Sequence, residues 1–425
     1  MNEVIEVRRA QNPISASVRP PGSKSATIRA LAAASLAAGR SHIYGALRAD
    51  DSEAMLRVVR GFGIDVDDGS DPWAVDGLGG HLSTPSEPID VGESGLSARI
   101  AVVLAAFAEG TTTLVGRGRL NERPMQSVID ILHDQGVDVH GTNGRLPITV
   151  AGQGGLWGGK MKVDCSKSSQ YATAVLLVSP LTSEPTSVRL VDLAGSSRYL
   201  DMTIELMESF GARVAPNITG FDAENHGYQP GDYVVEPDAS AAVYPAVAAA
   251  ITRGTVVIEG LRMSTGQPDM RVVRCLQDMG CAVESGDGGV RVTGPQGSLN
   301  PIHVDMSEAP DGSLGLAVAC LYADGESRID GLHSLQYKES DRLQAIATEM
   351  RSLGGDVTIQ GDSLVIRGSS LSASSVHSHG DHRIAMAMAL AGLNTDGVVV
   401  HGAGAVSKTW PHYWEMLETL ATSSI

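Results

Sequence analysis

The pattern of apolar and polar positions repeats a helix followed by two short strands. Amphipathic stretches such as "MQSVIDILHDQG" carry apolar residues at helical spacing and end at a glycine. Each glycine precedes a short strand, a polar turn and a second strand, as in "LGGDVTIQGDSLVIRG". The marker glycines lie about 70–75 residues apart, which is longer than most solenoid repeats: Gly63, Gly136, Gly211, Gly280 and Gly354.

The two chain ends predict how the repeat closes. The stretch "PHYWEMLETLA" is a sixth helix without a strand pair after it, whereas "NEVIEVRR" and "ISASVRP" alternate as two N-terminal strands. The simplest closure has both N-terminal strands complete the C-terminal unit. Six units then form two α/β domains of three units each. We expect a discontinuous domain of residues 1–19 and 238–425, a continuous domain of residues 20–237, and a hinge near 19–21 and 236–240.

Composition narrows the class of protein. A hydrophobic content of 42% with only 4% aromatic residues predicts aliphatic cores. The net charge of −17 argues against binding to nucleic acid or to an anionic membrane. The N-terminus has no apolar signal core, and no CxxC occurs, so we expect a reduced, cytoplasmic compartment. The cysteines are Cys165, Cys275, Cys281 and Cys320.

The stretch "PGSKSATIRA" leads directly into an Ala-rich run that predicts a buried helix. A Gly-rich helix entry exposes backbone N–H groups, and the helix dipole favours a negative charge there. Lys24 adds a point charge, Ser25 a hydroxyl and Arg29 a guanidinium. The stretch predicts a phosphate or carboxylate site, with an ordinary N-cap and solvated charges as an equally good alternative.

Three further clusters in the first half also lie at expected helix starts. "NERPMQS" sets Glu122, Arg123 and Pro124 there, where an arginine opposes the helix dipole; a surface arginine is the alternative. The other hydroxyl-rich entries fit either anion binding or N-capping: Ser168, Ser169 and Gln170 in "DCSKSSQYATA", and Ser196 and Tyr199 in "GSSRYLD".

The second half combines acids with cations. Asp311 precedes a very apolar helix, where an N-cap is the alternative. "QYKESDRLQAI" packs four charges together, and solvated helix charges are the alternative: Lys338, Glu339, Asp341 and Arg342. "HGDHRIAMAMALAG" sets three polar residues before a buried helix, and "AVSKTWPHYWE" isolates a lysine: Asp381, His382, Arg383 and Lys408.

Parallel helices would bring these clusters into one positive cleft that fits ligands with several negative charges. Metal binding is not indicated, because the His-rich "HSHGDH" lacks a matched set of carboxylate or cysteine ligands. We interpret His377 and His379 as part of a polar loop.

Seven stretches together resemble the 5-enolpyruvylshikimate-3-phosphate synthase (3-phosphoshikimate 1-carboxyvinyltransferase) family: "PGSKSATIRA", "ERPM", "SSQYATA", "PDGSLGLA", "YKESDR", "GDHRIAMA" and "SKTWPHYWE". They run in order from near Pro20 to near Trp414, so the resemblance covers essentially the whole chain. It implies an α/β fold, a two-domain inside-out α/β barrel with three βαβαββ units in each domain and an active site in the interdomain cleft.

The resemblance implies an enzyme of aromatic amino acid biosynthesis that needs no metal or organic cofactor. The 5-hydroxyl of shikimate 3-phosphate would attack the central carbon of phosphoenolpyruvate, and the tetrahedral intermediate would lose phosphate. These two small molecules would be its partners, glyphosate an inhibitor, and the protein a monomer.

By matched position, the resemblance also implies site residues. Shikimate 3-phosphate would be bound by Lys24, Ser25, Arg29, Ser168, Ser169, Gln170, Ser196, Tyr199, Asp311 and Lys338. Phosphoenolpyruvate would be bound by Lys24, Gly95, Arg123, Gln170, Arg342, His382, Arg383 and Lys408. Asp311 would be the base for the 5-hydroxyl, and Glu339 would exchange a proton with the methylene. Lys338 and Lys24 would complete the catalytic group.

Two departures from the family pattern concern inhibitor sensitivity more than the reaction. Many members carry Asn-Ala-Gly-Thr where this chain has "ESGL", beginning at Glu93, and a Pro where it has Ile100. The nearest alternative is carboxyvinyl transfer to UDP-N-acetylglucosamine. That related family usually has a loop cysteine in its first domain, and this chain has none before Cys165. A non-catalytic anion-binding protein would not need the acids Asp311 and Glu339.

Overall fold

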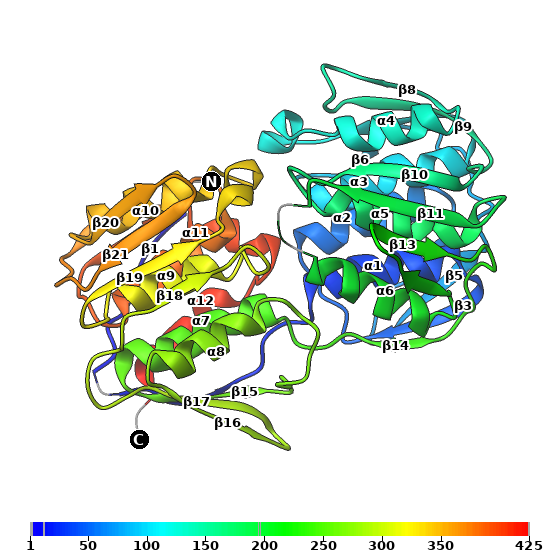
Figure 1. Ribbon diagram of the computed structural model, residues 1–425. Helices are drawn as coiled ribbons and strands as arrows, with labels where there is room; N and C mark the ends of the chain where they lie inside the picture. Colours follow the sequence, from blue (N-terminus) through cyan, green and yellow to red (C-terminus); the bar gives the residue numbers. More distant parts are fainter. Residues whose placement is uncertain (1–2, 12, 194, 196, 424–425) are drawn as a thin grey trace. The chain divides into compact units, whose positions relative to one another are not determined.

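The computed structural model describes residues 3–11, 13–193, 195 and 197–423 of the 425-residue chain. The chain divides into two compact units (Figure 1). Unit 1 comprises Met1–Pro21 and Pro237–Ile425, and unit 2 comprises Gly22–Glu236. The chain therefore leaves unit 1 after Pro21 and returns to it after Glu236.

Unit 2 alternates strands and helices. Its strands are β3 (Ala38–Tyr44), β4 (Asp65–Asp67), β5 (Trp73–Leu78), β6 (Ile89–Asp90), β7 (Glu109–Val115), β8 (Asp138–Gly141), β9 (Ile148–Gln153), β10 (Gly159–Asp164), β11 (Thr186–Val191), β12 (Val214–Pro216), β13 (Gly220–Ala223) and β14 (Asp232–Val234). Its α-helices are α1 (Lys24–Leu36), α2 (Asp50–Gly61), α3 (Gly95–Leu104), α4 (Gln126–Asp134), α5 (Gln170–Val178) and α6 (Arg198–Ser209). Short 3-10 helices are η1 (Ala105–Phe107), η2 (Gly118–Glu122) and η3 (Ser179–Leu181).

Unit 1 is built in the same way from both ends of the chain. Its strands are β1 (Val4–Glu6), β2 (Ser15–Val18), β15 (Thr255–Glu259), β16 (Ala282–Gly286), β17 (Gly289–Thr293), β18 (His303–Asp305), β19 (Glu326–Asp330), β20 (Asp356–Gln360), β21 (Ser363–Arg367), β22 (Ser374–His377) and β23 (Val398–His401). Its α-helices are α7 (Ala239–Thr252), α8 (Met270–Asp278), α9 (Ser313–Cys320), α10 (Arg342–Ser352), α11 (His382–Gly392) and α12 (Tyr413–Thr422). Its 3-10 helices are η4 (His333–Tyr337) and η5 (Ala403–Lys408).

One sheet pattern recurs through both units. In the sheet β6–β7–β9–β8, the first two strands are parallel, and the last two join antiparallel as a hairpin. Helices α3 and α4 separate its strands, which gives the order βαβαββ. Within the described residues, unit 2 has three such sheets, and unit 1 has two together with the three-stranded sheet β1–β23–β22. The prediction of six repeated units in two groups of three is confirmed, although the sixth sheet has one strand fewer.

The predicted closure by the two N-terminal strands is half wrong. β1 pairs antiparallel with β23, as predicted, with Val4 opposite His401. β2 instead pairs parallel with β15, with Val18 opposite Ile258. Pro13, which has no backbone N–H to donate to a sheet, lies between β1 and β2, where the chain passes from one sheet to the other. β2 thereby supplies the first strand of the repeat that resumes at α7, after the whole of unit 2.

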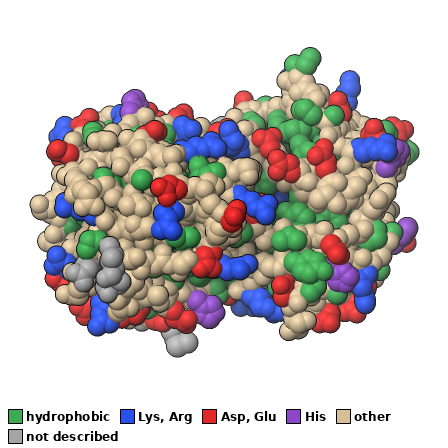
Figure 2. All heavy atoms as spheres, turned by 90° about the horizontal axis from the view of Figure 1, so that it is seen from below, with side chains coloured by type: hydrophobic (Ala, Val, Ile, Leu, Met, Phe, Trp, Pro, Cys, Tyr) green, Lys and Arg blue, Asp and Glu red, His purple; other side chains and the backbone are tan. Residues whose placement is uncertain are grey.

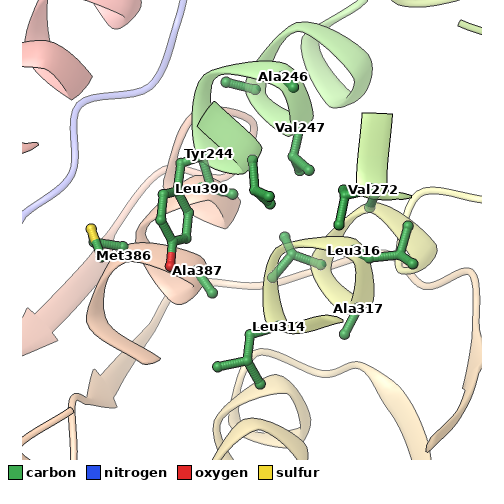
Figure 3. Packing of buried hydrophobic residues seen from close by; sticks show 14 of the residues in the cluster. Tyr244, Ala246, Val247, Val272, Leu314, Leu316, Ala317, Met386, Ala387 and Leu390 are labelled. Carbon is green, nitrogen blue, oxygen red and sulfur yellow. The ribbon is translucent and has the colours of Figure 1, made fainter. Parts of the chain in front are cut away.

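Buried helices form the centre of each unit. Helices α7, α9 and α11 pack against one another in unit 1, and α1, α3 and α5 do so in unit 2. Figure 3 shows Tyr244 and Val247 of α7 beside Leu316 of α9 and Leu390 of α11. At Gly315, an added Cβ would collide with α7. Small and aliphatic side chains therefore allow the close helix packing that the Ala-rich sequence predicts.

The starts of these buried helices come together within each unit. In unit 2, Arg99 of α3 donates a hydrogen bond to Gln170 at the start of α5. In unit 1, Arg383 at the start of α11 forms an ion pair with Asp311, two residues before α9. Each unit thus places polar side chains among several N-terminal helix ends, where the dipoles favour bound anions.

The surface carries charges of both signs. Lysine and arginine side chains are interspersed with acids on the face drawn in Figure 2. On this face the acidic side chains are therefore spread rather than gathered into one patch. Among the described residues, no helix is both long and apolar enough to cross a bilayer.

Candidate active site

A buried arginine stands at the centre of the polar cluster in unit 2. Arg29 of α1 is 1% exposed. Its Nε donates to Thr203 Oγ1 at 2.8 Å and its Nη1 to the Ser25 carbonyl oxygen at 3.0 Å, while Nη2 reaches Thr173 Oγ1 and the Tyr199 carbonyl oxygen at 3.3 and 3.4 Å. These partners are neutral oxygens, and burial lowers the pKa of Arg29 to about 10. A bound anion would stabilise this buried charge.

Lys24 begins α1 beside a buried acid. Its Nζ lies 3.1 Å from Asp51 Oδ2, and the two side chains are 15% and 6% exposed. The hydroxyl of Ser23 caps the helix by accepting from a backbone N–H of the first turn, so the hydroxyl of Ser25 is not the cap. The N-cap alternative is therefore right for Ser23, whereas the solvated-charge alternative is wrong for Lys24 and Arg29.

Two buried arginines, Arg99 and Arg123, lie beside Gly95 at the start of α3. Arg99 is 1% exposed, and its Nη1 donates to the Gly95 carbonyl oxygen at 2.8 Å and to Gln170 Oε1 at 2.9 Å. A Cβ on Gly95 would lie only 2.5 Å from Arg123 Nη1, so glycine permits this approach. Arg123 is 6% exposed, so the surface-arginine alternative is wrong. Helix α4 begins only at Gln126, three residues after the predicted start at Arg123.

The predicted hydroxyl groups lie at two helix starts of unit 2. Ser168 Oγ accepts from the backbone N–H of Gln170 at 3.2 Å. Ser169 occupies the N-cap position of α5, but its side chain makes no cap hydrogen bond. The N-capping alternative therefore applies to Ser168 and not to Ser169. Tyr199 lies in the first turn of α6. Ser196 lies outside the described residues.

The two departures from the family pattern differ in their surroundings. Glu93 is exposed, and its carboxylate lies against the backbone of Gly118 in η2. Ile100 is fully buried within α3, so it contributes to the core of unit 2. Only Glu93 therefore adds a charge near the start of α3.

Arg342 organises the polar cluster of unit 1. It is 1% exposed and donates to Asp311 Oδ1 at 2.9 Å and to Glu339 Oε2 at 2.7 Å. It also binds both oxygens of Asp381, at 2.7 and 3.1 Å. Burial alone would lower the pKa of Arg342, but the three carboxylates raise it. One guanidinium thus holds both predicted acid–base residues in defined positions.

Asp311 is surrounded by cations rather than serving as a helix cap. The N-cap of α9 is Gly312, so the N-cap alternative for Asp311 is wrong. Lys338 Nζ lies 3.1 Å away, Arg342 Nη1 2.9 Å and Arg383 Nη2 3.2 Å. Burial would raise the pKa of Asp311, but these three cations outweigh burial and hold the pKa well below its usual range.

Glu339 lies between two cations. It contacts Arg342 and, through Oε1, Lys408 Nζ at 3.5 Å, and Lys408 is 6% exposed. Burial lowers the pKa of Lys338, although Asp311 opposes this shift. Only Asp341 has the ordinary helix role, because its side chain caps α10. The alternative of solvated helix charges is therefore wrong for the rest of the cluster.

The start of α11 completes the cluster of unit 1. Asp381 caps the helix by accepting from the backbone N–H of Arg383 at 2.9 Å. His382 is fully buried, with Nδ1 3.6 Å from Asp381 Oδ1. The sequence offered no acid within α11 as a partner for Arg383, and the structure supplies Asp311 from another segment.

The histidines of "HSHGDH" do not form a simple loop. His377 ends β22, and its ring stacks on His401 with centroids 4.9 Å apart. His379 Nε2 lies 2.6 Å from Oε1 of the buried Glu349. The polar-loop interpretation is therefore wrong for His377. The residues that the structure describes contain no group of three or more His, Cys, Asp or Glu that could hold a metal ion.

Sequence reasoning missed several polar residues. Asp51 has the sequence context of an ordinary acid in the first turn of a helix, and no role is assigned to Arg99 from the sequence. Asp381 was noted without a role, although it binds Arg342. Asp269 was not noted at all, yet it is 1% exposed and accepts from the backbone N–H beside Asp311. Burial of a charged side chain is the signal that identifies them, and burial requires the fold.

Buried cations at helix starts, together with acids held among them, are typical of an enzyme that binds multiply charged anions and transfers protons. Comparison with known proteins identifies the particular family. Residues 8–417 match the family model described as EPSP synthase (3-phosphoshikimate 1-carboxyvinyltransferase). The chain belongs to this family.

Curated relatives and solved structures agree with this assignment. A 3-phosphoshikimate 1-carboxyvinyltransferase of Methanothermobacter thermautotrophicus is 39% identical over 402 residues, which is 94% of each chain. The protein of the same name from Acetivibrio thermocellus is 34% identical over 97% of each chain. An EPSP synthase structure from Acinetobacter baumannii matches with a TM-score of 0.83 at 25% identity, over 100% of this chain and 99% of that chain.

The predicted family, fold class and enzyme class are thus confirmed. The chain is a transferase of the shikimate pathway, and the alternative transfer to UDP-N-acetylglucosamine is not favoured. All four cysteines are also buried, and burial raises the pKa of Cys165 to about 12, so this thiol is not a ready nucleophile or acid.

Proposed function

We propose that this chain transfers the enolpyruvyl group of phosphoenolpyruvate to the 5-hydroxyl of shikimate 3-phosphate, giving 5-enolpyruvylshikimate 3-phosphate and phosphate. Family membership supports the reaction. The observation that carries the mechanism is Arg342, whose guanidinium binds Asp311 and Glu339 at 2.9 and 2.7 Å. Two acids held by one buried cation suit a reaction that moves two protons.

Shikimate 3-phosphate would be bound mainly by unit 2. The buried charge of Arg29, with its neutral partners, suits the phosphate, and the helix starts nearby supply further donors. We assign to this substrate Lys24, Ser25, Arg29, Ser168, Ser169, Gln170, Ser196 and Tyr199, with Asp311 and Lys338 near the 5-hydroxyl.

Phosphoenolpyruvate has a carboxylate and a phosphate, which need cations from both clusters. Arg123 and Lys24 would contribute from unit 2. Gly95 leaves the room that two guanidiniums occupy beside the start of α3. The full set for this substrate is Lys24, Gly95, Arg123, Gln170, Arg342, His382, Arg383 and Lys408.

The addition step transfers two protons. The 5-hydroxyl oxygen bonds to the central carbon of phosphoenolpyruvate while Asp311 takes the hydroxyl proton. Glu339 gives a proton to the methylene carbon, which becomes a methyl group. In the elimination step, the bond to the phosphate oxygen breaks, phosphate leaves with the proton that Asp311 had accepted, and Glu339 takes back a proton from the methyl group to restore the double bond. Lys338 assists at the hydroxyl, and Lys24 assists the transfer of charge to the departing phosphate.

The resting pKa of Asp311 shapes this mechanism. A carboxylate held among three cations is a weak base. When the anionic groups of phosphoenolpyruvate take up Arg342 and Arg383, these cations would neutralise less of the charge on Asp311. The pKa of Asp311 would then rise, so the base would become effective only with the second substrate bound.

Because the assigned residues belong to both units, the substrates must bring the two clusters together. We propose that the hinge lies near residues 19–21 and 236–240, with residues 1–19 and 238–425 moving as one domain against residues 20–237. Binding of the substrate phosphate would favour a closed form, and closure would exclude water around Asp311 and Glu339.

We further propose a cytoplasmic monomer that uses no cofactor and is inhibited by glyphosate in competition with phosphoenolpyruvate. Inhibition that excess phosphoenolpyruvate does not relieve would contradict the competitive site. The exposed carboxylate of Glu93 would weaken an anionic inhibitor, so Glu93→Gln should increase glyphosate sensitivity.

Phosphate release from phosphoenolpyruvate tests the function directly. We expect release with shikimate 3-phosphate, none with UDP-N-acetylglucosamine, and no loss of rate in EDTA. Release with the UDP-sugar alone would overturn the proposed acceptor. A rate that EDTA abolishes and a divalent cation restores would overturn the metal-free mechanism.

A further inference from the structure

Unit 1 contains a buried carboxylate to which neither the reaction nor the family resemblance gives a role. Asp269 stands immediately before α8 and is 1% exposed. It occupies the N-cap position of α8, but its side chain caps no N–H group of that helix. A buried carboxylate is costly unless it is well bonded, so its partners indicate what it does.

Both oxygens of Asp269 bind groups outside its own helix. Oδ1 accepts from the backbone N–H of Gly312 at 3.0 Å, and Oδ2 accepts from the hydroxyl of Ser240 in the first turn of α7. A Cβ on Gly312 would lie 3.0 Å from Oδ1, so the backbone of this turn lies close against the carboxylate. Asp269 thereby connects the start of α7 to the residue that follows Asp311.

The segment that carries Asp269 is itself anchored to the chain crossing. Gln267 Nε2 donates to the Pro237 carbonyl oxygen at 2.8 Å, and Gln267 Oε1 accepts from the Ala239 N–H at 3.0 Å. The side chain of Asp238 caps α7. The side chains of Gln267 and Asp269 therefore both bind the start of α7, so the backbone that carries Asp269 is held in place.

Two of the charged groups around Asp269, Arg383 and Asp311, belong to the proposed catalytic cluster. Burial raises the pKa of Asp269, Arg383 opposes this shift, and Asp311 and Asp238 add to it. Arg383 in turn lies 3.2 Å from Asp311. A change in the position of Asp269 would therefore alter the surroundings of the base, as well as the turn that bears it.

We propose that Asp269 is a positioning residue, which fixes the carboxylate of Asp311 among its three cations by holding the N–H of Gly312. This inference rests on the proposed role of Asp311 as the base. Misplacement of a reacting group by about 1 Å can reduce a rate by about 100-fold, so the loss of this hydrogen bond should affect turnover more than substrate binding.

Substitutions at positions 269 and 240 separate the effect of the hydrogen bond to Gly312 from that of the hydrogen bond to Ser240. Asp269→Ala removes both acceptors, whereas Asp269→Asn keeps one carbonyl oxygen that can accept from the Gly312 N–H. Ser240→Ala removes only the other partner. Asp330→Asn is a matched control in the same unit, because Asp330 also accepts from a serine hydroxyl, that of Ser363, at 2.6 Å.

Kinetics and titration provide the readouts. We expect Asp269→Ala to lower kcat by about 10- to 100-fold with KM for both substrates within about threefold. Asp269→Asn and Ser240→Ala should keep kcat within about threefold, and Asp330→Asn should leave kcat unchanged. In carboxyl-13C-labelled protein, loss of the Asp269 charge lowers the pKa of Asp311 equally in both variants, whereas displacement from the cations raises it only in Asp269→Ala, so the pKa of Asp311 should be higher in Asp269→Ala than in Asp269→Asn.

Several outcomes would overturn the inference. They are a kcat of Asp269→Ala within twofold of wild type, an equal pKa of Asp311 in Asp269→Ala and Asp269→Asn, or a kcat of Asp269→Asn below one tenth of wild type. The Asn result decides the matter even where the Ala variant does not fold. Asp311→Asn separates the two proposals: near-normal turnover in Asp311→Asn removes the proposed base itself, whereas inactive Asp311→Asn with normal Asp269→Ala removes only the positioning role.

Discussion

The two units of this protein hold a buried arginine in opposite ways. Arg29 and Arg342 are each 1% exposed. Arg29 binds neutral oxygens, and burial lowers its pKa to about 10, whereas three carboxylates raise the pKa of Arg342 despite burial. Arg29 thus has a charge that a ligand can neutralise, while Arg342 is already neutralised and orients the acids around it. This difference supports the proposal that unit 2 binds the phosphate of shikimate 3-phosphate, whereas unit 1 holds the acids that would move protons.

The largest expected effect comes from neutralising the acids of unit 1. Asp311→Asn and Glu339→Gln should each lower turnover by about 100-fold or more, because a positioned acid or base contributes about that much. Steady-state phosphate release measures the effect, and the affinity for substrates should change little. Asp330→Asn, an acid of unit 1 outside the cluster, should retain normal turnover. Near-normal turnover in either cluster variant would remove that residue from the proton transfers.

A smaller effect is expected on the thermal stability of the folded protein, through the ion pairs of Asp311 in unit 1. The folded pKa of Asp311 lies well below its usual range, and the unfolded value is about 3.9. A lowered pKa stabilises the folded protein above about pH 4, and this stabilisation is lost as the pH falls towards the folded pKa. Asp311→Asn should therefore melt several degrees lower than wild type at pH 6, with a difference that shrinks below pH 4.

Thermal melts followed by circular dichroism between pH 3 and pH 7 measure this dependence. Asp341→Asn is the control, because asparagine also caps helices well and α10 should keep its cap. Its melting temperature should follow that of wild type throughout. A difference between Asp311→Asn and wild type that stays constant down to pH 3 would contradict the assigned ion pairs.

Much of the fold follows from the sequence because its signals are local. A glycine after each amphipathic helix and an alternating strand pair after each glycine predict the repeat, and the spacing predicts six units. The partner of β2 could not be predicted in this way. β2 pairs with β15, which lies more than 200 residues away along the chain, and the alternation within a strand does not specify its neighbour.

The candidate site likewise combines features that the local sequence predicts with features that only the tertiary fold creates. Helix-start positions indicated Lys24, Arg29 and Arg383 as ligands for anions. The three carboxylates around Arg342 could not be predicted, since Asp311 and Asp381 lie 31 and 39 residues from it. A charged run such as "YKESDR" is usually solvated, and only the fold buries it. Local sequence therefore indicates which polar residues lie at helix starts. The tertiary contacts determine which of them are buried and which charges they pair with.

The smallest expected effect is a change in overall dimensions. If the clusters of the two units act on one substrate pair, shikimate 3-phosphate should reduce the radius of gyration measured by small-angle scattering. Shikimate, which lacks the phosphate, should reduce it much less. Added salt should weaken the response, because screening reduces both the repulsion between cations and the binding of the phosphate. Equal compaction by shikimate, or an unliganded protein as compact as the complex, would contradict closure by the phosphate.

Calorimetric titration with shikimate 3-phosphate measures whether Arg29 of unit 2, rather than the acids of unit 1, provides the affinity for this substrate. Arg29→Ala should weaken binding by about 10-fold or more, since a hydrogen bond to a charged group contributes about 1.5–3 kcal/mol. Arg40→Ala, a surface arginine paired with Asp76 in the same unit, should bind as wild type does. Asp311→Asn should bind within about threefold of wild type although its turnover is lost. Normal binding by Arg29→Ala, or an equal loss of affinity in Arg29→Ala and Asp311→Asn, would contradict the account.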